Sequence, residues 1–90
     1  MLTVIKRTGL EEPYNQNKIT NSIAAVAEEL GQPLNTSDIA SIASEMEQLI
    51  AEKTKITSRQ LYMILIGILI TCGFTDIANS YIKHISNPWN

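Results

Sequence analysis

The cationic side chains of this acidic chain are unevenly placed. Lys18 falls in the first turn of the helix expected after Asn15, where the helix dipole already presents positive charge and disfavours a cation by about 0.3–1 kcal/mol. A bound anion would reverse this effect, because the helix N–H groups, Lys18 and Lys6 could together hold a phosphate chain. The alternative is a surface ion pair of Lys18 with Glu11 or Glu12, which would contribute little to stability. Six of the seven cations lie in the expected strand regions or the helix ends beside them: Lys6, Arg7, Lys18, Lys53, Lys55 and Arg59.

No residue pattern indicates catalysis. The single histidine, His84, and the single cysteine, Cys72, lie on different expected helices, and no base or oxyanion donor is suggested around them. Metal-ligand spacings are absent, and four glycines are too few for a phosphate-binding P-loop. We therefore expect a protein that is not an enzyme and that has no metal site.

Composition indicates one folded domain over residues 1–90. The chain is 44% hydrophobic and 18% charged, which is typical of a folded soluble protein. It opens on a polar strand-like stretch and not on an apolar signal sequence, and its lone cysteine suits a reducing compartment. A net charge of −2 argues against general nucleic-acid binding, which needs a basic surface. We expect a cytoplasmic protein with no membrane contact and no direct nucleic-acid partner.

The hydrophobic pattern predicts a strand, a turn and a second strand, followed by four helices. The first strand covers residues 3–7, Thr8 and Gly9 make the turn, and residues 12–14 form a second extended piece. Residues 55–57 are a short β-prone segment. If this segment pairs with the first strand, it completes a small sheet and brings the cations to one end of the helical bundle.

Helix boundaries follow from capping residues and glycines. The first helix begins after Asn15 and ends at Gly31, and the second begins near Thr36 or Ser37. Ser58 is expected to cap the third helix, which ends at Gly73, and Thr75 the fourth. Three of these helices show an apolar stripe that should face inward: Ile19, Ile23, Val26, Ala27 and Leu30; Ile39, Ile42, Met46, Leu49 and Ile50; and Ile77, Ala78, Tyr81, Ile82 and Ile85.

The opening of the chain resembles a known family. The segments VIKRTG, EEPYN and KI, in this order, resemble the start of the ATP-cone, the nucleotide-sensing module of ribonucleotide reductases and of the repressor that controls their genes. The resemblance continues through Ile56-Thr57-Ser58 and through Ala78-x-x-Tyr81-Ile82. It implies an α+β, mostly α fold in which a small three-stranded sheet lids a four-helix bundle. ATP or dATP, which could carry magnesium, would bind between the sheet and the helices.

The resemblance also implies roles for individual residues. Phosphates would meet Lys6 and Arg7, with Lys18 beside them and Thr57 nearby, and His84 corresponds to a fourth-helix residue close to them. Apolar walls around the base would be Val4, Tyr14 and Ile19, and polar atoms of the base or sugar would meet Glu12 and Asn15. As alternatives, Val4 and Ile19 are plain core, Tyr14 is a hydrophobic staple on the first helix, and His84 is solvated. One departure is Thr8, which stands where the family usually has Asp.

The third helix departs from the family pattern. Its segment LYMILIGILITCGF is apolar on nearly every face, but it is too short to cross a membrane. A domain of this size should leave part of such a helix exposed as an interface, at Met63, Ile64, Gly67 and Ile68. The alternative is complete burial by the other helices.

Two functions therefore stand. The first is a regulatory domain that senses ATP or dATP and couples its occupancy to oligomerisation or to a ribonucleotide-reductase-related partner. The second is a cone-like interaction domain that acts through the third helix without nucleotide.

Overall fold

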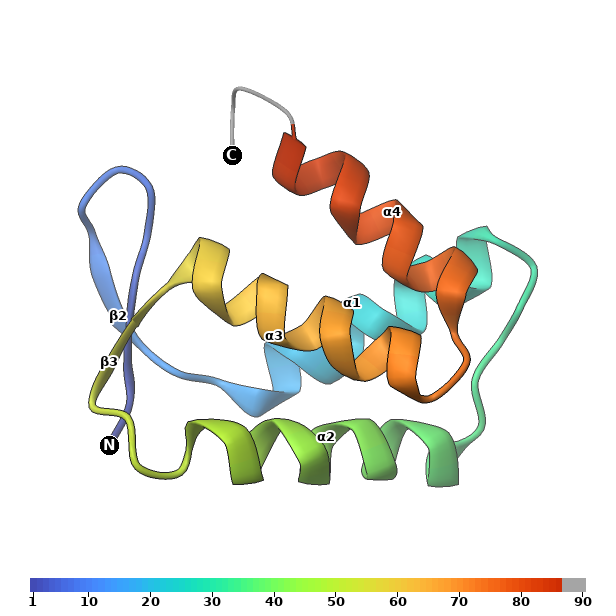
Figure 1. The fold of residues 1–90 in the computed structure, drawn as a ribbon, viewed down its shortest axis with the longest axis horizontal. Helices are drawn as coiled ribbons and strands as arrows, with labels where there is room; N and C mark the ends of the chain where they lie inside the picture. The colour runs from blue at the N-terminus through green and yellow to red at the C-terminus, as the bar shows by residue number, and fades with distance from the viewer. Residues whose placement is uncertain (87–90) are drawn as a thin grey trace.

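The computed structural model describes the backbone of residues 1–86 and the side chains of residues 1–83. It confirms the expected fold class, because a small three-stranded sheet stands at one end of four helices (Figure 1). The elements, in chain order, are β1 (Thr3–Ile5), β2 (Glu11–Pro13), α1 (Gln16–Glu29), α2 (Thr36–Ile50), β3 (Lys55–Thr57), α3 (Ser58–Thr71) and α4 (Thr75–Ser86).

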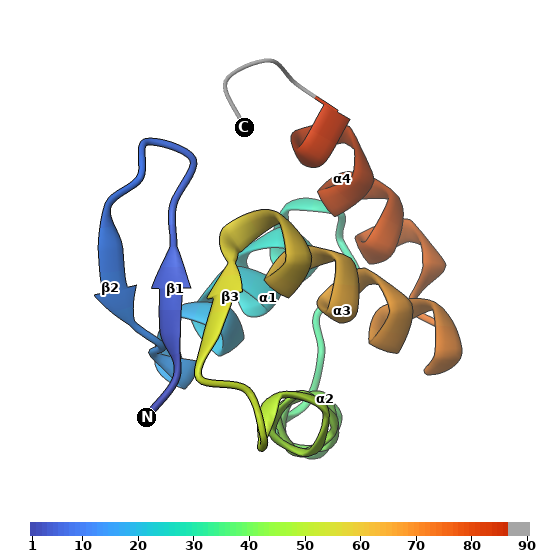
Figure 2. The same cartoon turned by 60° about the vertical axis from the view of Figure 1, so that its left-hand side comes forward.

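Strand β1 is the centre of the sheet, whose order is β2-β1-β3 (Figure 2). It pairs antiparallel with β2 and parallel with β3, so that Val4 lies opposite both Glu12 and Ile56. The β3 segment therefore does pair with the first strand, as the sequence suggested. This parallel pairing brings the start of α3 next to the β1–β2 hairpin.

The hairpin turn shortens the first strand relative to its prediction. The Lys6 N–H donates to the Leu10 carbonyl at 2.8 Å, and the Gly9 N–H donates to the Lys6 carbonyl at 2.8 Å. Lys6 and Arg7 therefore belong to the turn and not to the strand. Gly9 has a φ of +89°, a left-handed conformation that favours glycine, so the turn predicted at residues 8 and 9 is confirmed. The second strand begins at Glu11, one residue earlier than predicted.

Side-chain caps begin the first three helices. Asn15 caps α1 as predicted, since its Oδ1 accepts from the Asn17 N–H at 3.0 Å, and Asn35 caps α2. The cap predicted at Ser58 is wrong by one residue. Thr57 takes that role, because its Oγ1 accepts from the Gln60 N–H and the Gln60 side chain accepts from the Thr57 N–H, both at 3.1 Å.

The start of α4 also differs from the prediction by one residue. Thr75 is the first helical residue, and the first turn closes on the carbonyl of Phe74, which accepts from the Ala78 N–H at 3.0 Å.

The core lies along α3, which contributes five buried residues. Its neighbours are α2 and α4 along the bundle and β1 and β3 at the sheet (Figures 1 and 2). Residues from all four helices are fully buried: Ile23, Ile42, Met46, Leu65, Leu69 and Ile77. No helix within the described residues is long and apolar enough to cross a membrane.

Three residues predicted to face inward are exposed. Leu30 is the C-cap of α1, Leu49 stands beside the buried Met46–Ile50 stripe of α2, and Ile82 lies on α4; their exposures are 42%, 53% and 41%. Each lies at a helix end or at the edge of its stripe, where the side chain is only partly covered. The side chains of Ile85 and His84 lie outside the described residues.

Replacing Thr57 with Ala should lower the free energy of unfolding by about 1 kcal/mol, because the capping box of α3 is lost. Thr57→Ser keeps the hydroxyl and should retain most of this stability. Urea denaturation of the three proteins measures the difference. A Thr57→Ala variant as stable as the parent would mean that the cap contributes nothing.

Candidate functional site

A cavity of about 510 Å³ lies between the β1–β2 hairpin and the helices α1, α3 and α4. Its size is in the range of small-molecule sites. The hairpin and α4 stand on opposite sides of the start of α3 (Figure 2). Apart from Thr57, and from His84, whose side chain lies outside the described residues, the residues predicted for the nucleotide site line this cavity: Val4, Lys6, Arg7, Glu12, Tyr14, Asn15, Lys18 and Ile19. In place of Thr57, whose hydroxyl caps α3, the cavity is lined by the next residue, Ser58.

One carboxylate holds two of the cavity's cations. Glu12 Oε2 lies 3.5 Å from Lys6 Nζ and 3.7 Å from Lys18 Nζ. The ion-pair alternative raised from the sequence is therefore present, and it occurs inside the cavity. Since both lysine side chains are about half exposed or more, these pairs add little stability. Arg7, which also lines the cavity, makes no ion pair with any described residue.

The start of α1 has fewer free N–H groups to offer an anion than the sequence suggested. The Asn17 N–H already donates to Asn15 Oδ1 at 3.0 Å, and the Lys18 N–H donates to the Asn15 carbonyl at 3.1 Å. The helix dipole and the Lys18 ammonium remain as attractions for an anion.

Only half of the expected cation cluster reaches the cavity. Lys53, Lys55 and Arg59 are not among its lining residues, and Lys55 pairs with Glu11 at 3.5 Å. Lys55 and Glu11 lie on the two edge strands of the sheet, while Lys6 and Arg7 extend from the hairpin turn.

The sequence did not assign the far wall of the cavity to the site. There, Ser22 of α1 and Tyr81 of α4 place their hydroxyl oxygens 2.6 Å apart. The Tyr81 ring stacks on Tyr62 of α3, with centroids 5.7 Å apart and planes at 24°. Tyr81 was predicted only as an inward-facing residue. The spacing of Lys18, Ser22 and Val26, four residues apart on one face of α1, is the signal that could have extended the site.

Two tyrosines in the cavity wall have perturbed hydroxyl groups. Burial, partly offset by the Ser22 hydrogen bond, raises the pKa of Tyr81 to about 12. Burial, with a smaller effect from the Glu47 carboxylate, raises the pKa of Tyr14. The Tyr14 ring lines the cavity, while its hydroxyl is buried without a hydrogen-bond partner among the described residues. No group of three His, Cys, Asp or Glu side chains within the described chain could hold a metal ion.

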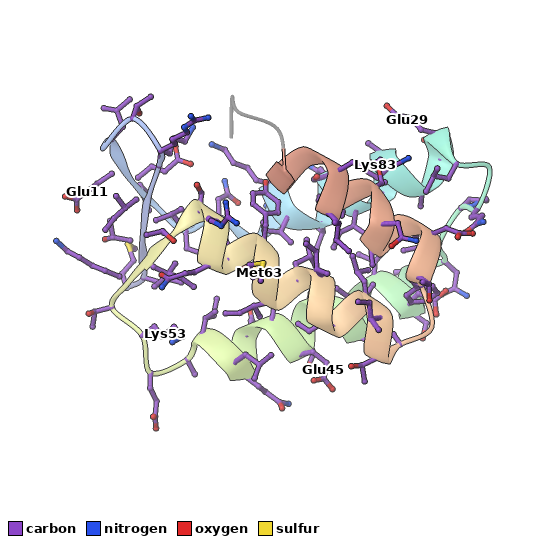
Figure 3. All side chains as sticks on the ribbon, turned by 45° about the horizontal axis from the view of Figure 1, so that its top comes forward. Glu11, Glu29, Glu45, Lys53, Met63 and Lys83 are labelled. Carbon is purple, nitrogen blue, oxygen red and sulfur yellow. The ribbon has the colours of Figure 1, made fainter. Side chains whose placement is uncertain are left out.

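The predicted interface on α3 is only partly exposed. Met63 is 56% exposed, Ile64 is half-buried and Gly67 is exposed, but Ile68 is 5% exposed and belongs to the core, so its placement in an exposed patch was wrong. The reason is its side of the helix: Ile68 follows Leu61 and Leu65 inward, whereas Met63, Gly67 and Ile70 face outward. A groove of about 370 Å³ runs between α3 and α2. Met63 and Glu45, whose side chains are labelled in Figure 3, both line it.

A family model of the ATP cone domain matches residues 2–86, and the chain therefore belongs to the ATP-cone family. This confirms the resemblance and assigns the chain a nucleotide-sensing, regulatory role. Among curated proteins, it is similar to the transcriptional repressor NrdR of Micrococcus luteus, with 35% identity over 49 residues, which is 54% of this chain and 29% of that protein. It is also similar to the NrdR repressor of Pseudarthrobacter chlorophenolicus, with 30% identity over 68 residues, which is 73% of this chain and 40% of that protein. The chain thus spans less than half the length of these relatives.

These relatives correct one prediction. The expectation of no direct nucleic-acid partner is contradicted, because the relatives are transcriptional repressors, which bind DNA. The expectation relied on net charge alone. The net charge of a regulatory domain does not report the partners of the longer proteins in which such a domain occurs.

Replacing Tyr81 with Phe should make the free energy of unfolding fall less steeply at high pH. In the parent, the folded chain keeps the Tyr81 proton to about pH 12, whereas an unfolded tyrosine loses its proton near pH 10. The contribution of the neutral Tyr81 side chain to the free energy of unfolding is therefore complete below pH 10. It falls by on the order of 2 kcal/mol as the pH rises towards 12. Urea unfolding between pH 8 and 11 measures the two slopes. Parallel slopes would contradict this assignment, whatever stability the variant loses at neutral pH with the Ser22 hydrogen bond.

Proposed function

We propose that residues 1–90 form one ATP-cone domain that binds ATP or dATP in the cavity between the hairpin and the helices. The observation that carries this proposal is the gathering of Lys6, Arg7 and Lys18 around one cavity in a chain with a net negative charge. Apolar walls from Val4, Ile19 and the Tyr14 ring suit a base, as the family resemblance implies. Thr57 does not line the cavity, but the next residue, Ser58, does. A phosphate group that contacts Thr57 would therefore have to extend past Ser58.

Binding requires that the nucleotide displace an internal ion pair. The phosphates would take the place of Glu12 beside Lys6 and Lys18, and Glu12 would be freed for polar atoms of the base or sugar, next to Asn15. Glu12 is the one carboxylate among the described lining residues, so the cavity offers magnesium few protein ligands. Magnesium would therefore enter bound to the phosphates as their counterion.

Removing both lysines should weaken ATP binding by more than about tenfold, because each charge-assisted contact contributes about 1.5–3 kcal/mol. Isothermal titration of the Lys6→Ala, Lys18→Ala double variant with ATP and dATP measures this loss. Lys53→Ala removes a cation outside the cavity and should bind like the parent. Parent affinity should also fall as salt rises, since added ions screen these groups. Equal titration curves for the double variant and the parent would refute the site.

The second part of the proposal concerns assembly. We propose that nucleotide occupancy is coupled to self-association, or to a ribonucleotide-reductase-related partner, in the cytoplasm. Apolar residues on the outer face of α3 support this: Met63, Gly67 and Ile70 are exposed, with Leu49 of α2 nearby across the groove. Nothing in the described structure lies within 4 Å of a Cβ added at Gly67. Packing inside the chain therefore does not require this glycine, and close approach of another backbone would explain it.

Met63→Glu should give folded monomers that still bind ATP, because a charge cannot be buried without a partner in an apolar contact. The parent is expected to sediment as a dimer or larger species, with a size that changes when ATP or dATP is added. Asn21→Glu introduces the same charge at an exposed position of α1 outside both cavities and should leave assembly unchanged. A parent that stays monomeric at high concentration, with and without nucleotide, would leave the α3 face as ordinary surface.

A further inference from the structure

Three of the seven large hydrophobic residues that are exposed in the described chain lie on one face of the molecule. Met63 and Ile70 stand on the outer side of α3, and Leu49 of α2 lines the groove between the two helices. We propose that this face docks on the same face of a second copy of the chain, in a two-fold arrangement with the two α3 helices antiparallel. This arrangement rests on the self-association proposed above and adds its surface, its partner and its register.

The face has opposite charges at its two ends. Arg59, Met63 and Gly67 follow one another at four-residue spacing along the outer side of α3, with Arg59 next to the sheet. Helix α2 runs in the opposite direction to α3 (Figure 1), and its Glu45 lines the groove together with Gly67. Figure 3 shows Glu45 and Lys53, which follows α2, on either side of Met63 along the bundle. The basic end of the face therefore lies at the sheet, and the acidic end lies beyond Met63.

The two charged groups on this face have no partner of opposite charge within the described chain. Arg59 and Glu45 are both exposed, and neither makes an ion pair with a described residue. Arg59 also lies in the first turn of α3, where the helix dipole disfavours a cation. A carboxylate brought to Arg59 by another molecule would offset this effect. Folding of a single chain thus leaves one cation and one carboxylate available for a contact between molecules.

A two-fold axis near Met63 matches these ends. Arg59 and Gly67 are each four residues from Met63, so each lies about 6 Å from it along the helix. In an antiparallel pair, Arg59 of one copy then crosses Gly67 of the other and points towards Glu45 beside that glycine. Nothing in the described structure lies within 4 Å of a Cβ added at Gly67, so the arginine side chain has open space there.

The same charges select the second copy as the occupant. Two-fold symmetry repeats the contact of Arg59 with Glu45, and Met63 and Leu49 of both copies are buried between the two ion pairs. A uniformly acidic or uniformly basic partner would match one end of the face and meet its own charge at the other. A parallel pair of α3 helices would bring like charges together at both ends.

Exchanging the two charges tests this pairing. Arg59→Glu and Glu45→Arg should each weaken dimerisation by about tenfold or more, because like charges then face each other in both contacts. The double variant restores opposite charges and should dimerise within about threefold of the parent. An equimolar mixture of the two single variants should form heterodimers, since every contact between them again joins opposite charges. Sedimentation measures each case, in the nucleotide condition in which the parent dimerises, and circular dichroism checks that each variant folds.

Lys83→Glu and Glu29→Arg are the matched controls. They make the same changes of charge at exposed positions of α4 and α1, outside both cavities and away from Met63 and Glu45 (Figure 3). Both controls should dimerise like the parent.

Cysteine cross-linking measures the register independently. A Met63→Cys, Cys72→Ser variant has its one cysteine at the axis, so mild oxidation should join its two copies. Cys72 of the parent is nine residues from Met63, which places the two Cys72 residues of a dimer roughly 27 Å apart along the helices. The parent should therefore give no cross-linked dimer.

Several results would overturn this arrangement and leave the proposed self-association in place. These are single variants that dimerise like the parent, a double variant that folds but stays monomeric, and a parent that cross-links through Cys72. Preferential pairing of Arg59→Glu with the parent is another, because the α3 helices would then run parallel. A parent that stays monomeric in every nucleotide condition would refute the arrangement and the self-association together, while the Lys6 and Lys18 variant tests the nucleotide site separately.

Discussion

The parallel pairing of β1 with β3 is the constraint on which the site depends. These strands are separated by half of the chain, and their pairing sets Val4 opposite Ile56. Because α3 begins at the residue that follows β3, the same pairing positions Ser58 and the first turn of α3 beside the hairpin that carries Lys6 and Arg7. The antiparallel pairing with β2 then leads the chain into Asn15 and the start of α1. Thus one three-residue strand positions the hairpin and two helix starts around a single cavity.

The burial of α3 ties this arrangement to the core. Five residues of α3 are buried, and its N-terminal turn both belongs to the cavity wall and leads into the core. Leu61 lines the cavity and is also a core residue, so the shape of the site is tied to the packing of the bundle. Replacing Leu61 would therefore change the site and the stability together. Only the outer face of α3, around Met63, is free of this double role.

The turn and the helix boundaries could be predicted largely from the residues, because local signals determine them, whereas the closed sheet and the residues of the near half of the cavity followed from the resemblance to the ATP-cone. Asn15, Gly9 and the stripe through Ile19 and Ile23 each act over a few residues, and the structure confirms the helix start, the turn and the buried face. Features that depend on distant segments were missed. The contact between Ser22 and Tyr81 joins residues 59 positions apart, and the burial of Ile68 depends on which sides of α3 the neighbouring helices cover. Neither can be deduced from spacing along a single helix.

The position of Glu12 has a consequence for which anions the cavity can accept. Its carboxylate already pairs with Lys6 and Lys18. Because Glu12 belongs to the same chain, an entering anion must compete with a carboxylate that is present at a high effective concentration. A small anion such as chloride can offer each lysine no more than Glu12 already offers. A polyphosphate bound as we propose would replace the carboxylate beside both lysines and also contact Arg7, so these linked contacts would favour it in the competition. In the proposed site, the internal carboxylate would therefore act as a filter that favours ligands with several linked charges over simple anions.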